Sequence, residues 1–190
     1  MTMTMDEKTK YETVWRDCAR YGKNWIDAGL GRPYKVPFLL GSKPGTVIDF
    51  GCGNGTSLRW LESQGYAPKG VEIASNAVSQ SRDFVTICDL RNGQTLLPIG
   101  VAEYGLCTDL MEHIPTEDVD IVLRNIAEHV SVGVLFGIAR LPDKDGDALG
   151  LELHLTLKEK AWWDEKLLQH FSSVQLVRYD DGCYIVWGWK

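Results

Sequence analysis

The chain has 190 residues, which is enough for one domain with a sizeable core, and its 44% hydrophobic and 24% charged content is ordinary for a globular protein. The formal net charge of −6 supplies no overall basic field of the kind that attracts nucleic acid or an acidic membrane surface. These numbers disfavour a nucleic-acid-binding protein, although a local basic patch is compatible with them.

The first half of the chain alternates between helical and strand patterns. Apolar side chains recur near helical spacing in the N-terminal segment, and the glycines and proline between residues 29 and 33 end that pattern. In chain order we expect a helix over 6–29, a strand over 46–50, a helix from Thr56 to about 65, a strand over 69–73, a short helix from about Ser75 and a strand over 84–88.

The second half continues this alternation. A strand is expected over 104–108, and the helix after it carries one apolar face over 119–126. The run VGVLFGIA at 132–139 is almost continuously apolar, as is typical of a strand covered on both faces. Thr156 and Glu159 have the spacing of a capping box, which predicts that a helix opens there.

The chain ends in two strand-like runs around Asp181-Gly182, a strong hairpin signal. Together with the five preceding alternations, this predicts an α/β fold. We expect a doubly wound, mostly parallel seven-stranded sheet with a C-terminal antiparallel hairpin and with helices on both faces.

Cysteine usage and the N-terminal residues indicate a compartment. The five cysteines are odd in number and form no C-x-x-C pair, which disfavours a disulfide framework or a zinc knuckle and favours reduced thiols. The beginning, MTMTMDEKTK, is polar, and no stretch approaches the roughly 18–20 apolar residues of a membrane span. We therefore expect a cytoplasmic protein without a membrane partner.

The stretch VIDFGCGNGTSL at 47–58 carries most of the functional inference. A strand that ends in glycines and turns into a helix exposes backbone N–H groups and a helix N-terminus to a ligand above the sheet. Dinucleotide folds require G-x-G-x-x-G, but Thr56 stands where the third glycine would fall. The spacing is instead G-x-G-x-G, with Asp49 two residues before Gly51, which disfavours a pyrophosphate ligand.

VIDFGCGNG resembles the first motif of class I S-adenosylmethionine-dependent methyltransferases, and the resemblance extends from about Thr46 to the C-terminus. It implies that Asp49 lies near the methionine amino group of the cofactor and that the glycine turn passes beneath it. It also implies that Glu72, 21 residues after Gly51, accepts hydrogen bonds from the ribose hydroxyls and that Asp89 and Leu90 hold the adenine edge. The implied cofactor-binding residues are Asp49, Phe50, Gly51, Cys52, Gly53, Gly55, Glu72, Ile73, Asp89, Leu90, Asp109 and Tyr21.

The resemblance also sets the domain organisation and a candidate catalytic segment. We interpret 1–190 as a single methyltransferase domain, with 1–45 as an N-terminal helical lid or substrate segment and 46–190 as the cofactor-binding core. CTDLMEHIP resembles the family's D-x-x-E-H-I stretch, which places Asp109, Glu112 and His113 beside the methyl donor.

The role of that segment has three alternatives. In the first, Asp109, Glu112 and His113 share one face of a helical turn, and His154 could close over the same point. These four side chains would then bind Mg²⁺, Mn²⁺ or Zn²⁺, similar to the arrangement in two metal-dependent branches of the family. Alternatively His113, Glu112 and His154 act without metal, as base or substrate contacts. In the third alternative they are structural.

The acceptor is less defined by the sequence. No N-P-P-Y, D-P-P-Y or Pro-Cys motif occurs, which argues against enzymes that methylate DNA amines or cytosine C5. Together with the acidic balance, this favours a small-molecule acceptor, a hydroxyl if the Asp109–His113 cluster acts as described. Two alternatives stay open: an acceptor at a nucleic-acid end or modified nucleotide, bound by a basic strip near Arg16, Arg20, Arg32 and Lys35, and a non-catalytic subunit that binds the cofactor.

Overall fold

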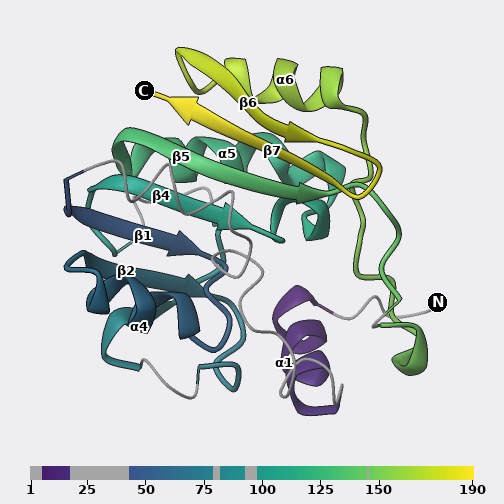
Figure 1. The fold of residues 1–190 in the computed structure, drawn as a ribbon. Helices are drawn as coiled ribbons and strands as arrows, with labels where there is room; N and C mark the ends of the chain where they lie inside the picture. The colour runs from purple at the N-terminus through teal and green to yellow at the C-terminus, as the bar shows by residue number, and fades with distance from the viewer. Residues whose placement is uncertain (1–5, 18–42, 79–81, 93–97, 145) are drawn as a thin grey trace.

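A seven-stranded sheet organises the parts of the chain that the computed structural model describes, which are residues 6–17, 43–78, 82–92, 98–144 and 146–190 (Figure 1). Its strands are β1 (Thr46–Phe50), β2 (Ala67–Glu72), β3 (Val85–Ile87), β4 (Ala102–Thr108), β5 (Val130–Ala139), β6 (Ser173–Tyr179) and β7 (Cys183–Trp189). The strand order is β3-β2-β1-β4-β5-β7-β6. β1 to β5 pair in parallel, whereas β7 pairs antiparallel with both β5 and β6. The expected fold class is confirmed.

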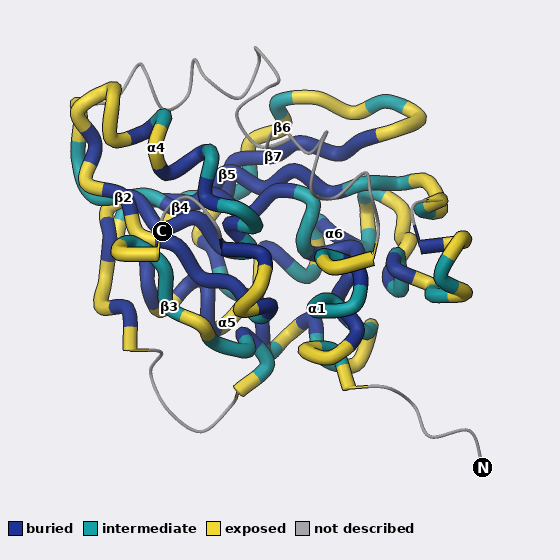
Figure 2. Tube along the Cα trace, turned by 90° about the horizontal axis from the view of Figure 1, so that it is seen from below, coloured by how far each residue is buried: buried dark blue, intermediate teal, exposed yellow. Residues whose placement is uncertain are grey.

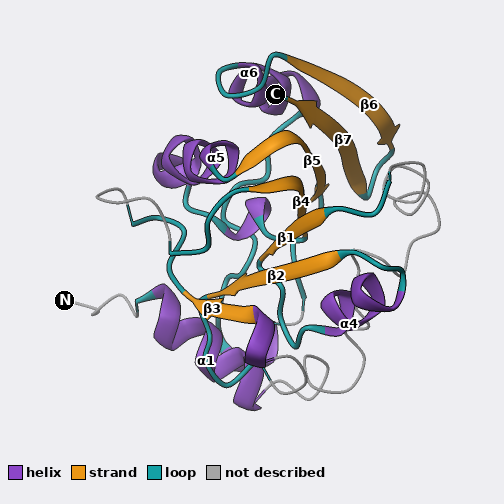
Figure 3. Cartoon of the chain, turned by 90° about the vertical axis from the view of Figure 1, so that its left-hand side faces the viewer, coloured by secondary structure: helices purple, strands orange, loops and turns teal. Residues whose placement is uncertain are grey.

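Helices cover both faces of this sheet: α4 (Thr56–Ser63), α5 (Val119–Glu128) and α6 (Lys160–Leu168). A further helix, α1 (Glu7–Asp17), lies beyond the strand ends (Figure 1), and short 3-10 helices occur at Arg82–Phe84, Met111–His113, Thr116–Asp118 and Asp147–Leu149. Figure 3 shows α5 and α6 on one side of the sheet and α4 on the other. Among the described residues, no helix combines the length and apolarity needed to cross a bilayer.

Two apolar layers hold the helices against the sheet. The buried face of α5 consists of Val119, Val122, Leu123 and Ile126, at the spacing expected from the sequence, and packs in one cluster with Trp163 and Leu167 of α6. The second cluster joins Leu61 of α4 to residues on the opposite face of the sheet, including Leu106, Leu135 and Trp187. In Figure 2 the central strands are dark blue, while β6, at the edge, is largely exposed. The middle of the sheet is therefore rigid enough to position a site at its rim.

The strand order places that site. From β1 the chain adds β2 and then β3 on one side of the sheet, and it then adds β4 and β5 on the other side of β1. The direction in which strands are added therefore reverses between β1 and β4. Ligands of open α/β sheets bind in the crevice that such a switch leaves at the carboxyl ends of the strands. The glycine-rich turn follows β1 and the segment with Glu112 and His113 follows β4, which brings the two sequence motifs to the same edge.

Three expectations from the sequence need comment. The helix expected from Ser75 is wrong over the described residues, because 75–77 form a turn. The prediction that Thr156 and Glu159 form a capping box is also wrong, because α6 begins at Lys160. The Thr156 hydroxyl instead donates to the carbonyl of Ile114, 2.7 Å away, in a buried contact between two loops. Of the helix expected over 6–29, only α1 lies within the described residues.

Candidate active site

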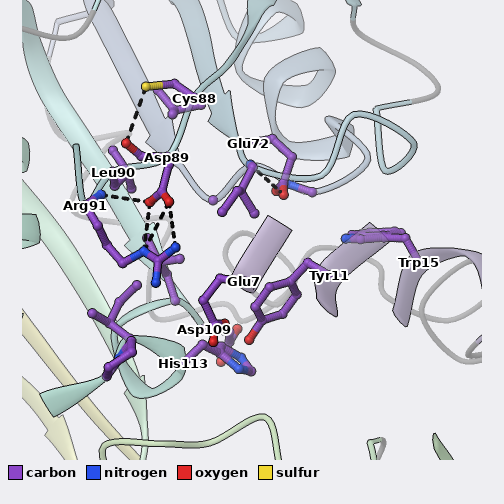
Figure 4. Close-up of a pocket in the computed structure, with 17 residues that line it drawn as sticks. Glu7, Tyr11, Trp15, Glu72, Cys88, Asp89, Leu90, Arg91, Asp109 and His113 are labelled. Carbon is purple, nitrogen blue, oxygen red and sulfur yellow. Dashed lines mark hydrogen bonds and ion pairs between the residues drawn. The ribbon is translucent and has the colours of Figure 1, made fainter. Parts of the chain in front are cut away.

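A pocket opens at the carboxyl ends of β1 to β4. It is lined by both sequence motifs and by side chains of α1, and Figure 4 shows these residues as sticks. The structure thus brings most of the predicted site to one place. The predicted residues that line it are Gly51, Gly53, Glu72, Ile73, Asp89, Leu90, Asp109 and His113.

The glycine turn has a left-handed backbone. Gly51, Gly53 and Gly55 have φ angles of 76°, 54° and 81°, in the left-handed region that side chains rarely adopt. Gly51 N–H donates to the Val71 carbonyl at 2.8 Å, which ties the turn to β2. A Cβ on Gly53 would lie 3.2 Å from the Trp15 ring. The backbone conformation therefore favours glycine at position 53, and Trp15 leaves little space there for a side chain.

Four predicted cofactor residues lie behind this turn. Asp49, Phe50 and Cys52 are 3%, 0% and 4% exposed, and Phe50 belongs to the hydrophobic core. The Cys52 side chain packs against β2, since a Cβ on Gly70 would lie 2.6 Å from its sulfur. Gly55 is the N-cap of α4. These four residues shape the turn from below and do not line the pocket.

Glu72, at the end of β2, fixes the turn in place. Its Oε2 accepts the Gly53 N–H at 3.0 Å, and its Oε1 accepts those of Ile73 and Ala74, both at 2.9 Å. Burial raises the pKa of Glu72, and the three backbone N–H groups oppose that shift. A carboxylate has about four acceptor positions, so three are filled and about one remains on this side chain, which lines the pocket. The expected contact to both ribose hydroxyls would therefore displace one backbone bond.

Asp89 lies at the opposite wall, in the loop after β3. The Arg91 guanidinium and backbone N–H both bind its carboxylate (Figure 4). Burial alone would raise the pKa of Asp89, but these hydrogen bonds outweigh it and lower the pKa. The pair also raises the pKa of Arg91.

The segment after β4 presents a buried histidine to the pocket. Asp109 has a φ of 53°, unusual for a residue with a side chain, and the 3-10 helix Met111–His113 follows it. His113 is 5% exposed, and its Nδ1 lies 2.9 Å from the Leu153 carbonyl. A carbonyl only accepts, so Nδ1 carries the proton and Nε2 the lone pair. Burial, and next the neighbouring His154, lower the pKa of His113 to about 3, so the ring is neutral at physiological pH.

Glu112, His113 and His154 form a tight group. One potential ligand atom from each lies within 4.8 Å of the others, and the two imidazole rings are 4.7 Å apart. Glu112 is fully buried, with Oε1 accepting the Ala139 N–H at 3.1 Å. His154 Nδ1 contacts the Leu141 carbonyl. Among the described residues, Asp109 is not part of this group, because the chain turns sharply between Asp109 and Glu112 instead of forming the expected helical face.

Helix α1 covers the pocket. The Tyr11 ring meets the His113 ring edge-on at 5.7 Å, and the Trp15 ring lies against Gly53. Glu12 fixes the helix to the turn after β2, because its side chain accepts from the Ser75 hydroxyl at 2.9 Å and its carbonyl accepts from Asn76 at 2.7 Å. In Figure 1 this helix lies beyond the carboxyl ends of β1 and β2. Tyr21, one of the predicted cofactor-binding residues, lies outside the described residues.

Comparison with known proteins decides the family. A model of the methyltransferase domain matches residues 30–179, which is more than half of the chain. The chain belongs to the class I S-adenosylmethionine-dependent methyltransferases. This confirms the resemblance inferred from the glycine turn.

Solved methyltransferases share the fold. Magnesium protoporphyrin IX methyltransferase from Synechocystis PCC 6803, solved with bound S-adenosylmethionine, is 18% identical with a TM-score of 0.71, and each chain covers 100% of the other. An O-methyltransferase family protein from Burkholderia thailandensis is 15% identical with a TM-score of 0.61, over 76% of this chain and 50% of that one. The neocarzinostatin-pathway O-methyltransferase, in complex with S-adenosylhomocysteine and 1,4-dihydroxy-2-naphthoic acid, is 17% identical with a TM-score of 0.54, over 75% and 48%.

A curated relative matches a shorter part. Ribosomal RNA small subunit methyltransferase C of Alcanivorax borkumensis is 41% identical over 51 residues, or 27% of this chain. The match spans only 14% of the length of that relative.

Sequence reasoning missed several pocket residues of this methyltransferase. Glu7, Tyr11 and Trp15 reach the pocket from α1, and Arg91 reaches it from the loop after β3. Tyr11 and Trp15 are four residues apart, on one helix face, which was a readable signal for an aromatic surface. It could not distinguish a surface packed on the core from one packed over a ligand site. No sequence signal indicated Arg91.

Proposed function

We propose that this methyltransferase transfers the methyl group of S-adenosylmethionine to a hydroxyl of a small-molecule acceptor, with His113 receiving the hydroxyl proton. The observation that carries the proposal is the meeting of the glycine turn, Glu72 and a neutral, buried His113 in one pocket. The solved relatives that act on, or are bound to, magnesium protoporphyrin IX and 1,4-dihydroxy-2-naphthoic acid support a small molecule.

The residues present fit the cofactor. Gly51 and Gly53 line the pocket without side chains, and Glu72, which also lines it, retains about one acceptor position. When bound, S-adenosylmethionine supplies an electrophilic methyl group on a sulfonium. We propose that Glu72 holds the ribose and that the backbone of Gly51 and Gly53 passes beneath the cofactor, with Asp49 and Cys52 supporting the turn.

His113 suits proton acceptance because of its fixed tautomer. The Leu153 carbonyl orients the ring and keeps Nδ1 protonated, which leaves the Nε2 lone pair for a hydroxyl. A pKa of about 3 makes the free imidazole a weak base. The hydroxyl proton, however, becomes strongly acidic as the oxygen bonds to the methyl carbon, so a weak base suffices once that bond forms. His154, half-buried beside His113, then provides a path for the proton toward solvent.

We also propose that α1 acts as the lid predicted for 1–45. Trp15 lies against the glycine turn and Tyr11 against His113, so α1 must move when the cofactor enters. After closure the two aromatic rings would exclude water, and aromatic faces suit a sulfonium cation.

Turnover tests the function directly. Purified protein is incubated with S-adenosylmethionine and pooled hydroxyl-bearing metabolites, and the formation of S-adenosylhomocysteine is measured; short oligonucleotides form a second arm. We expect turnover with the metabolites. Turnover with oligonucleotides alone, with binding that weakens steeply as salt rises, would instead establish the nucleic-acid alternative. Cofactor binding without turnover in either arm would favour the non-catalytic alternative.

A divalent cation at Glu112, His113 and His154 is a second proposal, favoured by their geometry. The three donors converge, and both imidazoles are held at Nδ1 by a carbonyl, the usual second contact of a metal-bound histidine. Imidazole and carboxylate ligands suit Zn²⁺ or Mn²⁺ better than Mg²⁺. A cation there would lower the pKa of the acceptor hydroxyl, and His113 would be a ligand instead of a base.

Removal of metal distinguishes these two roles of His113. If the cation is used, exhaustive chelation is expected to reduce turnover at least about 100-fold, and Mn²⁺ or Zn²⁺ should restore it. A His154→Asn variant should lose Mn²⁺ binding in calorimetry while it still binds S-adenosylhomocysteine. Unchanged turnover in the chelated protein, together with no heat of metal binding, excludes the cation and leaves His113 as the base.

A further inference from the structure

Helix α1 is attached to its surroundings by a polar contact and by an apolar contact. In the polar one, the Glu12 side chain accepts from the Ser75 hydroxyl and the Glu12 carbonyl accepts from the Asn76 amide, and both hydrogen bonds are exposed. In the apolar one, Val14, which is 0% exposed, packs against Leu153, which is 1% exposed. Because water competes for exposed hydrogen bonds but not for buried apolar contacts, the apolar contact should hold the helix more strongly.

The contact between Val14 and Leu153 forms a small apolar cluster of its own. It is separate from the two clusters that hold α4, α5 and α6 against the sheet, and its partly buried members are Trp15, Leu149 and Leu151. Val14 and Leu153 are not among the described residues that line the pocket, whereas Trp15, the next residue of α1, is. Val14 would therefore act on a ligand in the pocket through the position of α1.

Leu153 begins a segment that is fixed to the chain after β4. Its carbonyl lies 2.9 Å from His113 Nδ1. Further along, the N–H groups of Leu155 and Thr156 both donate to the Glu112 carbonyl, at 2.8 and 2.9 Å. This segment is therefore a fixed surface, and α1, which packs on it through one small cluster, is the part that can move.

We propose that Val14 and Leu153 form a latch that holds α1 over the pocket, and that both are positioning residues that act through this helix. The proposal rests on the proposed binding of S-adenosylmethionine beneath α1. Opening of the lid would expose both side chains to water, so burial of this pair favours the closed lid. A ligand leaves the pocket when the latch opens, and the latch thus sets the residence time of the cofactor and of S-adenosylhomocysteine.

The dissociation rate of tritiated S-adenosylhomocysteine, chased with unlabelled ligand, provides the first test. Val14→Ala is expected to raise this rate about tenfold, because the truncated side chain leaves the latch underpacked. Leu153→Ala should have a similar effect, and the double variant should release the ligand no more than about twofold faster than either single variant. Leu153→Met, which nearly conserves the volume, should stay within about threefold of the native rate. A native rate in Val14→Ala, or effects that multiply in the double variant, would overturn the proposal.

Val122 of α5 provides the matched control. It is also a valine on a helix and is 0% exposed, but it packs in the cluster that joins α5 and α6 to the sheet. Val122→Ala should lower the stability of the whole fold and still release S-adenosylhomocysteine within about twofold of the native rate. A tenfold faster release in this control would mean that any loss of packing loosens the site, and the latch would then be wrong.

The polar contact of α1 provides a second comparison. Glu12→Ala removes the hydrogen bond from Ser75 but keeps the carbonyl contact to Asn76, and it should raise the dissociation rate at most about threefold. A larger effect than that of Val14→Ala would assign the latch to Glu12 and overturn the proposal.

Hydrogen exchange tests the latch without any ligand. In Val14→Ala, the amides in the second half of α1 should exchange about tenfold faster than in the native protein, whereas those of β4 and β5 should keep their native rates. Unchanged exchange in α1 would overturn the latch, whether or not S-adenosylhomocysteine binds. Faster exchange in α1, together with no binding of S-adenosylhomocysteine to the folded protein, would support the latch and refute the proposed function.

Discussion

Replacing Glu72 by glutamine is expected to weaken binding of S-adenosylhomocysteine about 30- to 150-fold and to lower the free energy of unfolding by about 1–3 kcal/mol. The reason is the number of donors around this carboxylate. Three backbone N–H groups point at it, from Gly53, Ile73 and Ala74, and glutamine would turn one acceptor oxygen into an NH₂ donor. The misplaced donor would disturb the turn that the cofactor needs. Calorimetry and denaturant unfolding measure the two effects.

A matched control separates this role from the loss of any surface carboxylate. Glu103 also accepts a backbone N–H of β1, that of Thr46 at 2.9 Å, but at the opposite end of the strand. Glu103→Gln should leave cofactor binding unchanged. If Glu72→Gln bound S-adenosylhomocysteine with native affinity, the carboxylate would neither shape the turn nor hold the ribose, and the proposed cofactor site would be wrong.

The sequence was sufficient for the sheet and the glycine turn because both depend on local rules. β5 is a continuous apolar run because it is buried on both faces of the sheet. Val122 and Ile126 in α5 are four residues apart because they lie on one buried helix face. Gly51, Gly53 and Gly55 all have positive φ angles, which suit glycine. Strand ends of a parallel sheet meet at one edge, so the positions of Glu72 and His113 followed from the topology.

The remaining features depend on contacts between distant segments. Thr156 has the residue type and spacing of a helix cap, yet it bonds to Ile114, a partner that only the folded chain brings near. The Arg91–Asp89 pair is close in sequence, but nothing in the pattern shows that this arginine binds the carboxylate expected to hold adenine. The sharp backbone at Asp109 separates it from the Glu112 cluster, and local periodicity could not predict that turn.

The buried His113 should also appear in the pH dependence of stability, measured on chelator-treated protein. Its pKa is lowered from 6.5 to about 3 by folding, so below pH 6.5 the unfolded chain binds a proton that the folded chain does not. Stability is therefore lost as the pH falls from 6.5 toward 3. This histidine alone accounts for a loss of about 2 kcal/mol by pH 5. Between pH 7 and pH 5, the free energy of unfolding of a His113→Asn variant should fall by about 2 kcal/mol less than that of the native protein.

The same His113→Asn variant is expected to lower kcat about 100- to 1000-fold while binding S-adenosylhomocysteine within about twofold of the native affinity. Asparagine can still donate to the Leu153 carbonyl, as Nδ1 does, but it has no lone pair in place of Nε2. His170→Asn, at a half-buried histidine after α6, is the control and should retain native kcat. A native kcat in His113→Asn would mean that the acceptor loses its proton elsewhere.

The pH dependence of kcat in the native protein gives a further test. Because the neutral imidazole persists down to about pH 3, kcat should show no step near pH 6.5. Such a step would assign the proton transfer to a different group.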